Sequence, residues 1–216
     1  TSPFFQTIYI RVKNINSATS CIAVTSVDLI VEPLINPQIT SGTEGNNTIC
    51  VNYETGIVER PLTLYSNVIG PNYKYSLFRD GVEIPGATAD SYPILTAAPG
   101  LYEVEVSNNL STSVCPAGRS AVFEVIQSGP AHIVSVVSSE AFSDDQTITV
   151  TVEGYGNYWF QLDEGPILNN GGTFHDVSTG FHTVSIHDRK TENPSCASVT
   201  TAPIRIIDFP KFFTPN

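Results

Sequence analysis

The sequence contains no methionine and a single tryptophan, and only 14% of its residues are charged. Because there is no initiator methionine, we expect both ends to lie inside a longer chain. So small a charged fraction is low for a cytosolic enzyme and ordinary for an extracellular β-protein. No apolar run approaches the roughly 20 residues that a helix needs to cross a bilayer.

Positive charge is also scarce. Ten Lys and Arg residues stand against 21 Asp and Glu residues, so the net charge is -11. A surface this acidic repels phosphate groups, which argues against nucleic acid as a partner. It equally argues against an anionic membrane surface, and we expect no direct membrane insertion.

No stretch has a sustained 3.6-residue periodicity, so essentially no helix is expected. Short runs of alternating apolar and polar residues are instead separated by turn signals such as Asp80-Gly81 and Pro99-Gly100. This pattern predicts an all-β fold of the sandwich or barrel type. Apolar residues make up 41% of the chain, which is enough to build a core.

A pattern occurs three times: an alternating strand, a polar stretch, a cysteine and a second alternating strand. The copies begin at Thr7, Leu101 and Phe181. In the last two copies the similarity extends upstream, since NNTICVNYE resembles DQTITVTVE and NYKYSLFRDG resembles NYWFQLDEG. Repeats of this kind indicate a tandem architecture.

The repeat lengths predict tandem immunoglobulin-like β-sandwiches. Residues 34–128 form one sandwich (the middle unit) and residues 129–209 form the next (the last unit). Residues 1–33 are the closing hairpin of a truncated preceding repeat. An isolated hairpin is marginal in water, so we expect this one to lean on upstream chain, on the middle unit or on a partner protein.

The central strand of each unit is expected to point alternate side chains into the core. These side chains are Tyr73, Tyr75 and Leu77 in the middle unit, and Tyr158, Phe160 and Leu162 in the last unit. Trp159 falls on the opposite face. It is interpreted either as a half-exposed aromatic residue or as a platform for a ligand.

The four cysteines stand at positions 21, 50, 115 and 196. Cys50 and Cys115 are the two in the middle unit, so we predict a disulfide between them. Cys21 matches Cys115 in the repeat, and its partner is expected upstream. Cys196 matches it too, but Thr149 stands where the last unit would need a partner, so Cys196 is expected to be unbridged. A CxxC spacing, typical of zinc or redox sites, does not occur.

The search for chemistry yields no catalytic site. His182 and His187 are expected on opposite faces of one strand, so they cannot share a metal there. The carboxylate pairs are sequence neighbours beside strand ends and do not form the convergent pair of a glycosidase. Acidity would suit calcium at a junction between units, but a DxDxD-type run is missing. We expect no enzyme and no cofactor.

The C-terminal segment reads FPKFFTPN. It resembles the first residues of the gliding motility-associated C-terminal domain, the type B sorting signal of type IX secretion in Bacteroidota. There, Y/F-P-K-F-F-T-P-N is followed by G-D-G and N-D. The match covers Phe209, Pro210, Lys211, Phe212, Phe213, Thr214, Pro215 and Asn216. The tandem copies also resemble the immunoglobulin-like repeats of large surface adhesins that carry such signals.

The resemblance implies export across the outer membrane, and attachment to or release from the cell surface. It makes residues 210–216 a linker into a missing sorting domain. Two exposed phenylalanines, Phe212 and Phe213, need a surface to cover them. We therefore expect this ribbon to leave the last unit and dock on the sorting domain or on the export and anchoring machinery.

Together these observations predict a non-catalytic stalk segment of a cell-surface adhesin or gliding filament, located outside the cell and attached to the outer membrane. The expected partners are the type IX machinery at the C-terminal end and upstream repeats of the same chain. The alternative is an accessory carbohydrate-binding module of a secreted hydrolase, which would bind through Trp159.

Overall fold

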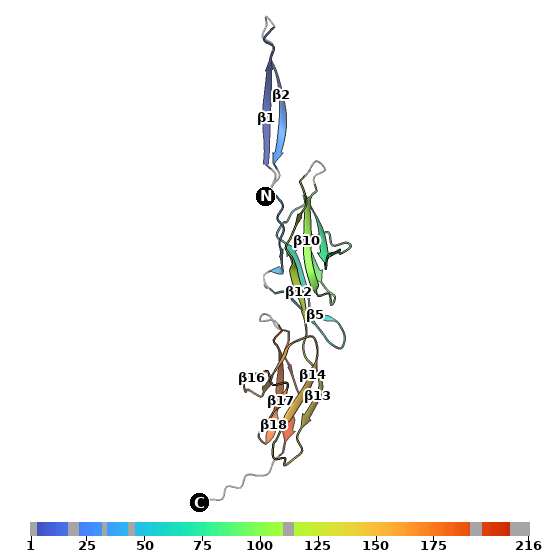
Figure 1. The fold of residues 1–216 in the computed structure, drawn as a ribbon, viewed down its shortest axis with the longest axis vertical. Coiled ribbons are helices and arrows are strands. Elements are labelled where there is room, and N and C mark those ends of the chain that lie inside the picture. The colour runs from blue at the N-terminus through green and yellow to red at the C-terminus, as the bar shows by residue number, and fades with distance from the viewer. Residues whose placement is uncertain are drawn as a thin grey trace, which may run out of the picture.

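The computed structural model describes residues 4–16, 22–31, 34–42, 46–109, 115–190 and 196–207. Within these ranges the regular structure consists of β-strands, without an α-helix, as the sequence predicts. Figure 1 shows a hairpin followed by two β-sandwiches arranged end to end.

The hairpin pairs β1 (Phe4–Lys13) with β2 (Ile22–Val31) in one unbroken antiparallel register. Residues opposite each other share a face, so Ile8, Ile10 and Val27 lie on the same apolar side. All side chains that the structure describes in the hairpin are exposed, with Ile8 at 43%. The middle unit does not cover this face. Of the three surfaces on which the hairpin is expected to lean, the upstream chain and a partner protein are still predictions.

The middle unit is a sandwich of two sheets (Figure 1). The smaller sheet has the order β3 (Ile39–Thr40), β6 (Leu62–Ser66) and β9 (Ser91–Ile94). The larger sheet has the order β5 (Val58–Arg60), β4 (Thr48–Val51), β12 (Phe123–Ser128), β10 (Gly100–Asn108), β7 (Tyr73–Arg79) and β8 (Val82–Glu83), and β11 (Gly118–Arg119) also pairs with β10.

Strand alternation builds the core of the middle unit. Tyr102 and Val106, four residues apart on β10, are both buried between the sheets. Tyr75 and Leu77 on β7 are buried in the same cluster and Tyr73 is partly buried against it, as the sequence predicts. Burial of each such side chain contributes roughly 1.5–3 kcal/mol.

The last unit is also a sandwich of two sheets. One sheet has the order β13 (His132–Ser138), β14 (Ile148–Glu153) and β17 (Thr173–Phe174). The facing sheet has the order β16 (Ile167–Leu168), β15 (Tyr158–Leu162), β19 (Val184–Asp188) and β20 (Val199–Thr200), and β18 (Gly180–His182) pairs with β21 (Ile204–Ile206). Phe160 is buried in its core, with Tyr158 and Leu162 partly buried beside it, as predicted.

A hydrogen bond at one corner recurs in both units. The Tyr102 hydroxyl donates to the Ala98 carbonyl at 2.7 Å. At the matching position of the last unit, His182 Nε2 lies 2.8 Å from the Ser178 carbonyl oxygen. A tyrosine that bonds back to upstream backbone is a hallmark of immunoglobulin-like sandwiches. Here a titratable histidine replaces it in one unit.

The environment of His182 favours its charged form. Its Nδ1 lies 2.7 Å from a carboxylate oxygen of Asp163, so both ring nitrogens face acceptors. Burial has the largest effect and lowers the pKa of His182. The hydrogen bonds to Asp163 and to the Ser178 carbonyl, with the Asp163 charge, outweigh it, and the net pKa is raised above the ordinary 6.5.

This pKa predicts a pH dependence of the last unit. A raised folded-state pKa stabilises the fold fully below the unfolded value of 6.5, and that contribution is lost as pH rises through the folded-state pKa. The melting temperature of the last unit should therefore fall as the pH rises from about 6.5 through the raised folded-state pKa of His182. His182→Tyr copies Tyr102 and should flatten the profile. His175 titrates in both proteins, so equal slopes would contradict the assignment to His182.

Candidate functional site

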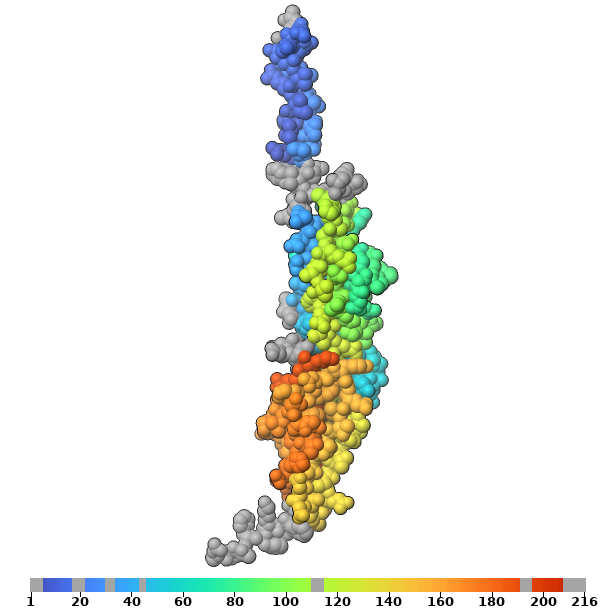
Figure 2. All heavy atoms as spheres, viewed as in Figure 1, coloured from blue at the N-terminus to red at the C-terminus, as the bar shows by residue number. Residues whose placement is uncertain are grey.

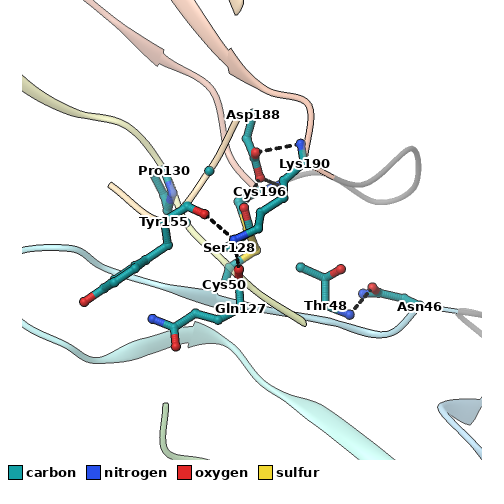
Figure 3. Close-up of a disulfide and its surroundings, with 12 residues drawn as sticks. Asn46, Thr48, Cys50, Gln127, Ser128, Pro130, Tyr155, Asp188, Lys190 and Cys196 are labelled. Carbon is teal, nitrogen blue, oxygen red and sulfur yellow. Dashed lines mark hydrogen bonds between the residues drawn. A yellow bond between two sulfur atoms is a disulfide. The ribbon is translucent and has the colours of Figure 1, made fainter. Parts of the chain in front are cut away.

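A disulfide joins the middle unit to the last unit. Cys50 and Cys196 are bonded at 2.00 Å between sulfurs and 5.7 Å between Cα atoms, across a sequence separation of 146 (Figure 3). The prediction of a bond between Cys50 and Cys115 is therefore wrong, and so is the prediction that Cys196 is unbridged. The covalent link lies between units rather than within one.

Strand direction explains the pairing. β4 runs parallel to β12, with Cys50 opposite Ser128. Because the chain leaves the middle unit directly after Ser128, Cys50 lies at the end where the last unit begins. Cys115 follows β10 and precedes β11, and its side chain is exposed. The remaining cysteine, Cys21, lies outside the described residues.

Asp188, at the end of β19, organises the junction. It is only 2% exposed. Its carboxylate accepts hydrogen bonds from the Ser128 hydroxyl at 2.6 Å and from the backbone N–H groups of Asn157, Lys190 and Cys196 at 3.2, 3.0 and 3.3 Å. One buried carboxylate thus satisfies donors from the link, from the turn before β15 and from Cys196 itself, which matches the rule for buried charge.

Lys190, two residues after Asp188, also bridges the junction. Its ammonium group donates to the carbonyl of Gln127 in the middle unit at 2.7 Å and to the carbonyl of Tyr155 in the last unit at 2.6 Å (Figure 3). Charge-assisted hydrogen bonds of this length are about twice as strong as neutral ones. Lys190 therefore joins the two backbones beside the disulfide.

An aromatic contact closes another side of the junction. The ring of Tyr53, from the middle unit, stacks on His132 at 5.9 Å between centroids and meets Tyr155 edge-on at 5.4 Å. The Nδ1 atom of His132 lies 3.5 Å from a carboxylate oxygen of Glu54. Aromatic pairs of this geometry contribute roughly 0.5–1.5 kcal/mol each. The two units are thus in direct packing contact as well as covalently linked.

The link between the units is held by Tyr158. Its hydroxyl lies 3.1 Å from the Gly129 carbonyl and 3.3 Å from the Pro130 carbonyl. Burial, the largest effect, raises the pKa of Tyr158, so the hydroxyl stays protonated and donates. Gly129 is required sterically, because a Cβ atom there would lie 2.1 Å from the carbonyl oxygen of Val51.

Two other sequence predictions concern Trp159 and the C-terminal segment. Trp159 on β15 is half-buried, and the guanidinium of Arg189 lies 6.0 Å from the ring centroid. Its role as a ligand platform stays a prediction. Phe209 to Asn216 lie outside the described residues, so their role as a docking segment stays a prediction too.

The residues that sequence reasoning missed are Asp188, Lys190 and Tyr53. One signal was available for Asp188, since the other two copies of the repeat have Asn14 and Asn108 at this position. An acid in place of an amide marks a site that must accept several hydrogen bonds. Lys190 and Tyr53 carry no such signal, because their partners belong to the neighbouring unit.

The contacts described at the junction are packing contacts, hydrogen bonds and one disulfide between the two units. In the ranges that the structure describes, no group of three or more His, Cys, Asp or Glu side chains is placed to hold a metal ion. The same ranges include no helix of the length and apolarity that a membrane span requires.

Comparison with known proteins identifies the fold. No protein-family model matches the chain, and no curated protein is similar to it in sequence. The crystal structure of murine CEACAM1b superposes with a TM-score of 0.52 at 10% identity, covering 81% of this chain and 100% of that one. Amphioxus IgVJ-C2 gives a TM-score of 0.39 at 11% identity, covering 68% and 96%. The fibronectin(III)-like modules of Clostridium thermocellum CbhA give 0.34 at 12%, covering 83% and 100%. The two-sheet architecture of both units, together with the CEACAM1b superposition, makes the chain an all-β tandem of immunoglobulin-like sandwiches.

Proposed function

We propose that this chain is a non-catalytic stalk segment of a cell-surface adhesin or gliding filament that the type IX secretion system exports. The observation that carries the proposal is the closed junction. A disulfide, a buried carboxylate and a bridging ammonium group fix two sandwiches end to end. A spacer that holds a distant binding tip away from a cell requires stiff joints of this kind.

The disulfide also supports a location outside the cytosol, because such bonds persist in oxidising compartments. The export route rests on the resemblance of FPKFFTPN to a type IX sorting signal. We further propose that residues 1–33 complete a preceding repeat, that 34–128 and 129–209 are the two spacer units, and that 210–216 lead into a sorting domain. Its partners are then upstream repeats and the export and anchoring machinery.

A carbohydrate-binding role receives less support. Such a site presents aromatic faces openly to a sugar, whereas Trp159 is half-buried beside Arg189. The stalk proposal needs no ligand site within these two units.

The test is made in the full-length protein, in the cells that produce it. Phe212→Ser combined with Phe213→Ser should abolish surface display while the sandwiches keep their stability. Phe181→Ser is the matched control, since Phe181 is 71% exposed and lies outside the segment. Normal display of the double variant would refute the export proposal. A stability loss of the size of a core deletion, roughly 3–5 kcal/mol, would instead place the segment inside the last sandwich.

A further inference from the structure

The disulfide is a shortcut along the chain. Cys50 and Cys196 are 146 residues apart in sequence, and their Cα atoms are 5.7 Å apart. Most strands of both sandwiches, from β5 to β19, lie between the two cysteines in sequence. A path along covalent bonds from one end of the chain to the other can therefore run through the disulfide and leave out residues 51–195.

We propose that the Cys50–Cys196 bond is a tension bypass. A load that enters the chain before Cys50 and leaves it after Cys196 crosses between the units through the sulfurs. Residues 51–195 then form a closed loop that carries no end-to-end force. That the protein bears load in the cell rests on the proposed stalk function; the bypass itself follows from the connectivity alone.

The bypass defines which strands tension can remove. On the N-terminal side these are β1 and β2, which pair with each other, β3, which pairs with β6, and the residues of β4 before Cys50, which pair with β12. On the C-terminal side they are β20, which pairs with β19, and β21, which pairs with β18. Pairings inside the loop, such as that of β7 with β10, lie outside the load path.

The disulfide keeps a long segment of chain from extending under tension. An extended chain spans about 3.5 Å per residue, so the separation of 146 corresponds to roughly 500 Å. The bonded chain can extend only through residues 1–50 and 196–216, to roughly 250 Å in total. The same chain with the bond reduced can extend through all 216 residues, to roughly 750 Å.

Burial keeps the bypass closed at rest. Cys50 and Cys196 are each 3% exposed, and Asp188 accepts a hydrogen bond from the backbone of Cys196. Thiol–disulfide exchange requires access of a thiolate to a sulfur atom. The bond is thus shielded from reductant while the junction is intact, and it becomes reducible when the strands around it are pulled away.

Single-molecule stretching of residues 1–216, with handles fused at both ends, tests the proposal. A variant with Cys21→Ser and Cys115→Ser leaves Cys50 and Cys196 as the only pair that can bond. We expect the full extension to be roughly 250 Å under oxidising conditions and roughly 750 Å after reduction. Cys50→Ser should give the longer value without reductant.

Equal extensions in the oxidised and reduced states would overturn the bypass. Once the bond has formed, the full extension depends on connectivity and not on whether the sandwiches stay folded. The outcome is also independent of surface display. A protein that is displayed normally without the FPKFFTPN phenylalanines would refute the export proposal and leave these lengths unchanged.

Discussion

Replacing both Cys50 and Cys196 by alanine is expected to lower the free energy of unfolding of the two sandwiches by roughly 4–5 kcal/mol. The bond closes a loop with a sequence separation of 146. In the chain-entropy description, a loop of this size restricts the unfolded chain strongly, and removal of the bond returns that entropy. Because the loop spans both units, the loss should also uncouple their unfolding.

Two probes make this measurable in denaturant. Trp159 is the only tryptophan, so its fluorescence follows the last unit, whereas far-ultraviolet circular dichroism follows both units. The two transitions should coincide in the oxidised protein and separate in the variant. Cys115→Ala, at an exposed position, should change stability by no more than about 0.5 kcal/mol. Unchanged midpoints in the double variant would show that the bond contributes nothing.

Asp188→Ala is expected to destabilise the last unit by about 3 kcal/mol and to loosen the junction. The substitution removes a carboxylate that is 2% exposed and leaves the Ser128 hydroxyl and three backbone N–H groups without their acceptor. Each buried donor left unsatisfied costs about 1–3 kcal/mol, less where water can enter. Asp188→Asn keeps the volume and one acceptor oxygen, so it should lose about half as much.

Thermal unfolding followed by Trp159 fluorescence measures this effect. Asp144→Ala is the matched control, because Asp144 is an exposed carboxylate of the same unit and should be nearly neutral. Should Asp188→Ala melt at the wild-type temperature, the hydrogen bonds to Asp188 would not be what holds this junction.

Local pattern was sufficient to predict the sandwiches. Alternation placed Tyr75, Leu77 and Phe160 in the cores because strand side chains have a period of two, whatever the rest of the fold does. The missing helical periodicity predicted essentially no helix, and the part of the chain that the structure describes has no α-helix. Both inferences depend only on neighbours along one strand, which a sequence displays directly.

The disulfide pairing depends on the end of the sandwich at which each cysteine lies, and periodicity does not show this. Spacing places Cys50 on an early strand and Cys115 after a late one, but it does not say at which end of the sandwich each lies. The parallel pairing of β4 with β12 brings Cys50 to the end that meets the last unit. The number of cysteines in each unit was the available clue. The middle unit has Cys50 and Cys115, whereas the last unit has only Cys196, because Thr149 stands where its partner would be.

The rest of the junction was hidden for the same reason. Lys190 bonds to the carbonyl of Gln127, and Tyr53 packs on Tyr155, so each pair spans two units. A contact between units depends on how the units are placed relative to each other. No pattern within one repeat encodes that placement.

The position of the disulfide also determines how the protein responds to proteases. The turns between the strands are exposed, as at Gly56 and Asn169, and exposed loop tips are where chains are nicked. A cut at either turn falls between Cys50 and Cys196, so the two fragments remain bonded through their sulfurs. Whatever is carried upstream of residue 50 stays attached to whatever lies beyond residue 196. A single cleavage between Cys50 and Cys196 therefore damages a sandwich but does not release the chain upstream of Cys50 from the chain beyond Cys196.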